Sequence, residues 1–101
     1  MHAVFQFDVP LEDARFAMEA AAAVASLRAT RGCRSATLVQ GIDDRSRWLL
    51  IAEWDGVGSY RRALSSYDVR SQAYPLLVRA RDEPSAFDEP GPLSTPSGPI
   101  S

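Results

Sequence analysis

The segment that most constrains the fold is the apolar run from Trp48 to Trp54, which lies between a polar turn and a glycine-containing stretch. A short apolar run of this kind, bounded by turn residues, is typical of a β-strand. The two faces of this strand carry Trp48, Leu50, Ala52 and Trp54 on one side and Leu49, Ile51, Glu53 and Asp55 on the other. Because both faces are partly apolar, we expect the sheet that contains the strand to be covered on both sides.

Alternating and helical patterns predict the elements before this strand. Residues 3 to 9 alternate apolar and polar side chains, which predicts a first strand. A helix is expected from Pro10 to about Arg31. Residues 33 to 42 are a second extended segment, and the polar residues after them predict a hairpin into the strand at 47–54.

The predicted first helix has a charged face and an alanine-rich face. Glu12, Arg15 and Glu19 share one side of a helical wheel. The opposite side, which we expect to be buried, carries Ala14, Ala17, Met18, Ala21, Val24 and Ala25. Such small side chains allow either close contact with the sheet or space for a ligand, and the sequence alone leaves both open. Gly32 is expected to cap the helix at its C-terminal end.

Two helical stretches are expected after the strand at 47–54. Asp55 is expected to cap a short helix that ends near Ser65. A further stretch from Ser66 is expected to bend at Pro75. The resulting order, β-α-β-β-α-(β), is that of a ferredoxin-like α+β sandwich with an antiparallel sheet. Helices would cover one sheet face, and we expect a second copy of the chain to cover the other, sheet to sheet.

The composition changes near the C-terminal end of the chain. Five of the seven prolines lie at or after residue 84. We therefore expect one folded domain over residues 1–83 and a Pro/Gly/Ser-rich segment over residues 84–101. A short fourth strand is expected at 85–88, where the prolines would confine it to the edge of the sheet.

The composition also excludes several classes of function. A net charge of -2 and a pI near 5.3 provide no basic surface for a phosphate backbone, so no nucleic acid partner is expected. Cys33 is the only cysteine, which excludes an intramolecular disulfide and a cysteine-based metal site. No apolar run approaches the roughly 18 residues of a membrane-spanning helix. We therefore expect a cytoplasmic protein that does not associate with a membrane.

Three short motifs in the chain are similar to those of the antibiotic biosynthesis monooxygenase family. They are Arg31-Gly32-Cys33 at the start of a strand, the strand from Trp48 to Trp54 that ends in Glu-Trp, and the later helix with Ser66-Tyr67-Asp68-Val69-Arg70. The resemblance implies a homodimer in which two sheets form an α/β-barrel, with a cavity between sheet and helices in each subunit. Members of the family include cofactor-free oxygenases of phenolic rings, haem-degrading enzymes and quinol oxygenases.

The haem-degrading branch of this family uses an asparagine, a tryptophan and a histidine. These residues map near Phe5, Trp54 and Tyr74 in this chain, and only the tryptophan is present. The chain contains no asparagine, and its single histidine is His2. We therefore expect neither haem degradation nor a bound metal or cofactor.

The cofactor-free oxygenase hypothesis requires an apolar pocket that excludes water and a group that stabilises a substrate anion. The substrate would be a small aromatic, phenolic or quinol-like molecule whose anion passes an electron directly to dioxygen. The candidate catalytic residues are Trp54, Tyr74 and Tyr60, and the candidate substrate-binding residues are Phe5, Phe7, Met18, Tyr67 and Arg70. Arg34 and Arg61 are further candidates to stabilise the anion.

Two alternative functions use the same fold. A polyketide cyclase or isomerase would fold or tautomerise its substrate in the same pocket. A non-catalytic, dimeric ligand-binding or interaction module would need no polar site residues, and the scarcity of such residues favours it. Trp54 and Tyr60 also occur at spacings that are typical of core residues, so both can serve the packing alone.

Overall fold

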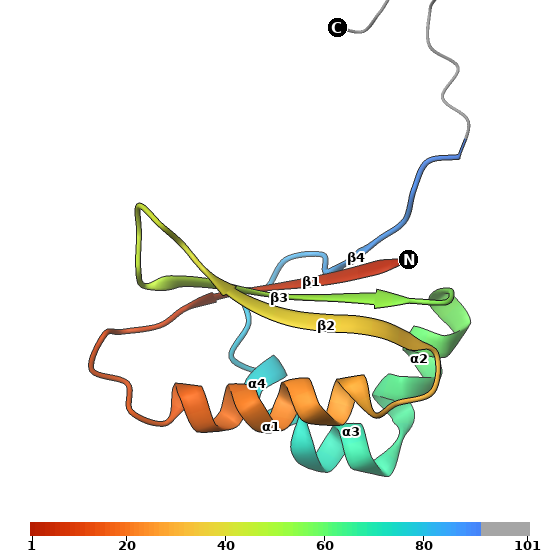
Figure 1. The fold of residues 1–101 in the computed structure, drawn as a ribbon, viewed down its shortest axis with the longest axis horizontal. Helices are drawn as coiled ribbons and strands as arrows, with labels where there is room; N and C mark the ends of the chain where they lie inside the picture. Colours follow the sequence, from red (N-terminus) through yellow and green to blue (C-terminus); the bar gives the residue numbers. More distant parts are fainter. Residues whose placement is uncertain (92–101) are drawn as a thin grey trace, which may run out of the picture.

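The structure, a computed structural model, describes residues 1–91 and places the helices on one side of a four-stranded sheet (Figure 1). In chain order the elements are β1 (His2–Asp8), α1 (Phe16–Arg28), β2 (Cys33–Gln40), β3 (Arg47–Trp54), α2 (Val57–Ser65), α3 (Tyr67–Gln72), α4 (Tyr74–Leu77) and β4 (Ala86–Phe87). Residues 92–101, which belong to the predicted Pro/Gly/Ser-rich segment, lie outside the described residues.

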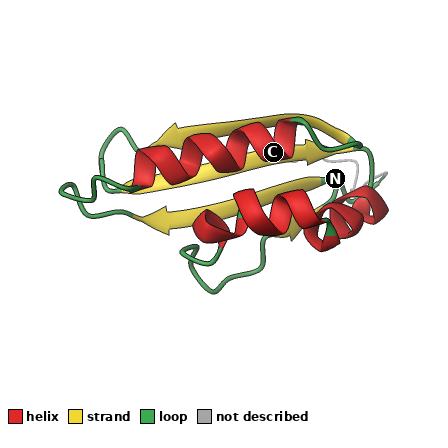
Figure 2. Ribbon diagram, turned by 90° about the horizontal axis from the view of Figure 1, so that it is seen from below, coloured by secondary structure: helices red, strands yellow, loops and turns green. Residues whose placement is uncertain are grey.

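The sheet has the strand order β2-β3-β1-β4, and every neighbouring pair is antiparallel. The register pairs Phe5 with Leu50 and Phe7 with Trp48, so these four side chains share one face. The helices lie across that face, as Figure 2 shows from the helical side. This order and connectivity are those of the ferredoxin-like α+β fold, which confirms the predicted fold class.

The hydrophobic core fills the space between the helices and the sheet. Phe7, Leu50 and Trp54 come from the two central strands and are almost fully buried. Val69 of α3 and Leu76 of α4 close the core from the helical layer. The strand predicted at 47–54 has the same bounds as β3, because its apolar pattern begins and ends at clear turn residues.

Helix α1 differs from the prediction in its start and in the face that it buries. The helix begins at Phe16, because the Asp13 side chain accepts hydrogen bonds from the backbone nitrogens of Arg15 (3.0 Å) and Phe16 (3.2 Å) and holds a turn before it. The buried residues are Phe16, Ala20, Ala23, Ser26 and Leu27. The predicted buried face was therefore wrong, and Met18 is 75% exposed.

Aromatic contacts explain why α1 buries a different face from the predicted one. The Phe16 ring centroid lies 5.7 Å from that of Phe7 and 5.3 Å from that of Trp48. Phe16 is the largest side chain of the helix and buries more apolar area than any alanine, so its contacts set the orientation. The alanines, which dominated the helical wheel, differ too little in apolar area from their neighbours to fix a face.

The two later helices begin at different kinds of cap. The predicted cap Asp55 does not serve α2, which begins after Gly56 without a side-chain hydrogen bond, because the Asp55 carboxylate accepts a hydrogen bond from Arg34 Nε at 3.0 Å instead. Ser66 caps α3, where its Oγ accepts a hydrogen bond from the Val69 backbone nitrogen at 3.3 Å.

Two further predicted positions lie at the ends of the sheet. Gly32 precedes β2 rather than capping α1 directly, and its φ of 90° is a conformation that other residues rarely adopt. A Cβ atom at this position would lie 2.5 Å from Ser59 Cβ, so the chain and α2 approach closely here. At the opposite edge, Ala86 and Phe87 form β4 within the segment predicted as an edge strand and pair with β1.

Candidate functional site

A cavity between β1 and the helical layer brings three of the predicted site residues together. We call it the tyrosine cavity. It has a volume of about 270 Å³ and is lined by Phe5, Tyr60, Leu64, Tyr74, Leu77, Val78 and Ser85. Each aromatic residue comes from a different element, since Phe5 lies in β1, Tyr60 in α2 and Tyr74 at the start of α4. The prediction that Pro75 interrupts the helical stretch is consistent with this position, because a new helix begins at Tyr74.

The polar atoms at this cavity are mainly phenol hydroxyls with weak partners. The Tyr60 hydroxyl lies 3.5 Å from Ser85 Oγ. The Tyr74 hydroxyl donates to the Leu64 carbonyl oxygen at 3.4 Å. Both distances are long for O–H···O hydrogen bonds, whose usual length is about 2.7–2.8 Å. Either hydroxyl can therefore exchange its partner for a polar group of a ligand at little cost.

Trp54 lies behind Tyr60, in the core rather than at the cavity wall. Its side chain is 1% exposed, and its ring centroid lies 5.8 Å from that of Tyr60. Within residues 1–91 its indole Nε1 is the only buried side-chain nitrogen or oxygen without a hydrogen-bond partner. A buried donor without a partner costs about 1–3 kcal/mol, so such groups often mark a place where function outweighs stability.

The other predicted site residues lie away from the tyrosine cavity. Phe7 is buried in the core against Phe16. Met18 and Tyr67 are exposed, Tyr67 to 86%, and Arg70 is exposed as well. None of these four lines the cavity, so their predicted substrate-binding roles receive no geometric support and stay predictions.

The candidate anion-stabilising arginines also lie elsewhere. Arg34 forms ion pairs with Asp55 (3.0 Å) and Glu53 (3.9 Å) at the start of β2. The carboxylate of Asp55, through its hydrogen bond, raises the pKa of Arg34 above its usual value. Arg61 is exposed on α2 and does not line the cavity. Stabilisation of an anion in the tyrosine cavity would therefore depend on hydroxyl donors.

Two other chemical features bear on the choice of reaction. Among the described residues, no group of three or more His, Cys, Asp or Glu side chains is placed to hold a metal ion. Cys33 is half-buried, and burial raises the pKa of its thiol, which disfavours the nucleophilic thiolate.

Among residues 1–91, no helix is long and apolar enough to cross a bilayer.

A second and larger cavity, of about 510 Å³, lies along α1 and is lined in part by Ala17, Ala21 and Val24 of the predicted alanine-rich face, for which the sequence left open either close contact with the sheet or space for a ligand. Its wall includes Phe16, Trp48, Arg28 and Arg45. The sequence gave neither Trp48 nor the two arginines a role in a ligand site. That Trp48 and the two arginines line one cavity depends on how the β2–β3 hairpin packs against α1, and no local sequence pattern encodes this packing.

The fold and the tyrosine cavity together define the class of protein. It is a ferredoxin-like α+β domain with an apolar, phenol-lined cavity between its sheet and its helices. The family model of antibiotic biosynthesis monooxygenases matches residues 1–71, and the chain belongs to this family. This confirms the family resemblance of the three sequence motifs.

Solved structures share the same fold. SnoaB, a cofactor-independent oxygenase from Streptomyces nogalater, is 24% identical and superposes with a TM-score of 0.74, covering 93% of this chain and 96% of its own. A protein from Methanosarcina mazei Go1 is 19% identical, with a TM-score of 0.68 and 84% of each chain covered. The protein PA3566 from Pseudomonas aeruginosa is 22% identical, with a TM-score of 0.59, covering 75% of this chain and 80% of its own. The chain has no match among curated proteins.

Proposed function

We propose that this chain is a cofactor-independent monooxygenase that oxidises a small aromatic, phenolic or quinol-like molecule in the tyrosine cavity. The observation that carries the proposal is the pair of weakly bonded hydroxyls, Tyr60 and Tyr74, at one apolar cavity. Membership of the antibiotic biosynthesis monooxygenase family supports the reaction class. A cavity of about 270 Å³ suits a compact ring system rather than a large one.

The proposed reaction uses the substrate as its own reductant. A phenol or anthrone loses a proton, and the resulting anion passes an electron to dioxygen. Recombination forms a carbon–oxygen bond, and loss of water gives the carbonyl product, so that RH₂ and O₂ become R=O and H₂O. The hydroxyls of Tyr60 and Tyr74 would donate hydrogen bonds to the substrate oxygen as its negative charge develops. Phe5 and the two leucines would exclude water from the anion.

We further propose that the active form is a homodimer joined through the open sheet face. Because Ala3 and Ala52 are buried on the helical side, the alternate residues of the strands point away from the helices. The apolar members of this open face are Val4, Val39, Leu49, Ile51 and Phe87. A second copy placed here would bury these side chains and leave the tyrosine cavity, on the other side of the sheet, accessible.

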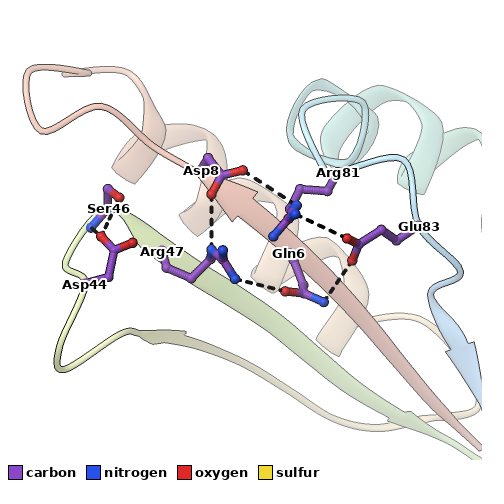
Figure 3. Close-up of polar contacts among 7 residues, drawn as sticks. All are labelled: Gln6, Asp8, Asp44, Ser46, Arg47, Arg81 and Glu83. Carbon is purple, nitrogen blue, oxygen red and sulfur yellow. Dashed lines mark hydrogen bonds and ion pairs between the residues drawn. The ribbon is translucent and has the colours of Figure 1, made fainter.

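A polar cluster borders this open face and is shown in Figure 3. Arg47 Nε donates to Asp8 at 3.1 Å, and Arg47 Nη1 donates to Gln6 at 3.3 Å. Gln6 in turn donates to Glu83 at 3.0 Å, and Arg81 lies 3.4 Å from Glu83. These charges satisfy one another within a single chain, so they can form the rim of an interface without needing a partner charge.

Oxygen consumption by the purified protein with a model anthrone or naphthoquinol tests the reaction. We expect Tyr74→Phe and Tyr60→Phe each to reduce the rate by about a hundredfold, which is typical of losing one donor to a developing oxyanion. Tyr67→Phe is the matched control, because Tyr67 is exposed and does not line the cavity. Activity that is unchanged in both cavity variants would place the chemistry elsewhere.

The dimer has its own test. Ile51→Glu introduces a charge at the centre of the open face and is expected to convert the protein to monomers in light scattering. Val57→Glu, at an exposed position on α2, is the matched control. A wild-type protein that is monomeric at micromolar concentration contradicts the dimer and leaves the reaction to be judged by oxygen consumption.

A non-catalytic ligand-binding module is the second candidate function. It is favoured by the absence of any charged side chain from the seven residues that line the tyrosine cavity. A model anthrone that binds stoichiometrically, without oxygen uptake and without any product, supports this candidate. Product that forms equally fast without dioxygen instead indicates a cyclase or isomerase.

A further inference from the structure

The larger cavity, which we call the α1 cavity, is separate from the site of the proposed function. It lies between α1, the edge strand β2 and the first residues of β3. None of its lining residues lines the tyrosine cavity. Its volume of about 510 Å³ falls within the usual range of about 300–1,000 Å³ for small-molecule sites.

The walls of the α1 cavity are apolar over most of their length. Phe16 and Trp48 form its aromatic end, with ring centroids 5.3 Å apart. Leu38 of β2 lies on one side, and Ala17 and Ala21 of α1 lie on the other. The small alanine side chains leave the space between helix and strand unfilled. The cavity therefore follows the helix from its aromatic start toward its C-terminal end.

Two arginines give this apolar cavity an excess of positive charge. Arg28 and Arg45 both line it, and neither forms an ion pair with any residue of the described range 1–91. Asp13 is the only carboxylate among the lining residues, and it is bound by Arg79. An unpaired guanidinium at the border of an apolar space favours an anionic partner, because the partner replaces water with directed hydrogen bonds.

Arg28 is the better placed of the two cations. Its Nε donates to the Ala36 carbonyl oxygen at 2.9 Å, which holds the guanidinium against the edge of β2. The two terminal nitrogens keep their donors for a ligand, and a carboxylate fits them bidentately. Arg45 lies in the β2–β3 connection, near the opposite end of the cavity. Arg28 and Phe16 are the last and first residues of α1, about 18 Å apart at 1.5 Å per residue.

We propose that the α1 cavity binds a monocarboxylic acid with an elongated apolar body, of the medium-chain fatty acid type. The carboxylate binds Arg28, and the chain extends along Ala21 and Ala17 toward Phe16 and Trp48. Positive charge, apolar walls and length all match a ligand with one charged end. A neutral molecule of the same shape leaves Arg28 without a partner and binds more weakly.

Calorimetric titration of the full chain with decanoate, and with 1-decanol as the neutral analogue, tests this proposal. We expect one decanoate per chain, with binding at least about tenfold tighter than that of decanol. Arg28→Gln should weaken decanoate binding by about tenfold or more, whereas Arg31→Gln, an exposed arginine that does not line the cavity, should not. Equal binding of decanol, or equal effects of the two substitutions, overturns the proposal.

A second pair of variants tests the location. Ala21→Leu fills the cavity from an exposed position of α1 and should abolish binding, while Ala25→Leu, exposed on the same helix but outside the cavity, should not. Circular dichroism shows whether both variants keep the wild-type fold. Tyr74→Phe should leave decanoate binding unchanged even where it slows oxygen consumption, so failure of either proposal is seen separately. Absence of any decanoate binding to the wild-type chain refutes the site.

Discussion

The contacts of Phe16 predict that Phe16→Leu lowers the free energy of unfolding by more than the small change in side-chain volume would. Phe16 is 3% exposed and contacts two aromatic rings, Phe7 at 5.7 Å and Trp48 at 5.3 Å between centroids. The Arg79 guanidinium lies 5.4 Å from the same ring centroid. Phe16→Leu keeps most of the side-chain volume but removes all three ring contacts. Each aromatic pair is worth about 0.5–1.5 kcal/mol beyond its buried area, and the cation–π contact about 0.5–1 kcal/mol. We therefore expect a loss of about 1.5–4 kcal/mol in the free energy of unfolding.

Urea denaturation followed by circular dichroism measures this loss, with all variants at one protein concentration because association adds to stability. Tyr67→Leu is the matched control: Tyr67 is 86% exposed and has no aromatic partner among the described residues, so its loss should stay below about 0.5 kcal/mol. A double-mutant cycle of Phe16→Leu with Trp48→Leu should give a coupling of about 0.5–1.5 kcal/mol. A Phe16→Leu loss no larger than that of Tyr67→Leu would refute the reasoning.

Two other predictions concern the turns at the ends of α1. The hydrogen bond from Arg79 holds the pKa of the Asp13 carboxyl below its usual value, so this group stabilises the fold above about pH 4 and loses that contribution as the pH falls through its lowered pKa. The stability difference between wild type and Asp13→Asn, measured by urea denaturation, should therefore shrink toward pH 2, and a constant difference contradicts this. Gly32→Ala should lower stability by more than about 1 kcal/mol, because φ is 90° and Ser59 lies in the way. Gly56→Ala, where no atom lies within 4 Å, should have little effect; equal losses at both glycines would show that neither strain nor contact matters.

The strands could be predicted from the sequence because their signals are local. The bounds of β3 follow from an apolar run between turn residues, and the alternation of β1 predicts which of its side chains face the helices. The orientation of α1 could not be predicted in the same way. Its alanines fall on every side of the helix, and the decisive residue, Phe16, finds its partners only on β1 and β3.

The candidate site was predictable to the extent that it depends on the order of elements. Phe5, Tyr60 and Tyr74 come together because a ferredoxin-like fold places β1 beneath the second helical unit. Met18 was predicted from the wrong face of α1, and its exposure follows from the rotation of the helix. The Arg28 and Arg45 positions depend on packing between distant segments, which leaves no mark in either local sequence.

The separation of the two cavities has a consequence for how this small chain can change. The tyrosine cavity depends on β1, α2 and α4, whereas the α1 cavity depends on α1 and the β2–β3 hairpin. The hairpin turn can therefore lengthen or change composition without displacing Tyr60 or Tyr74. A protein engineer can randomise this turn as an independent module, and natural variation in it can proceed under its own selection.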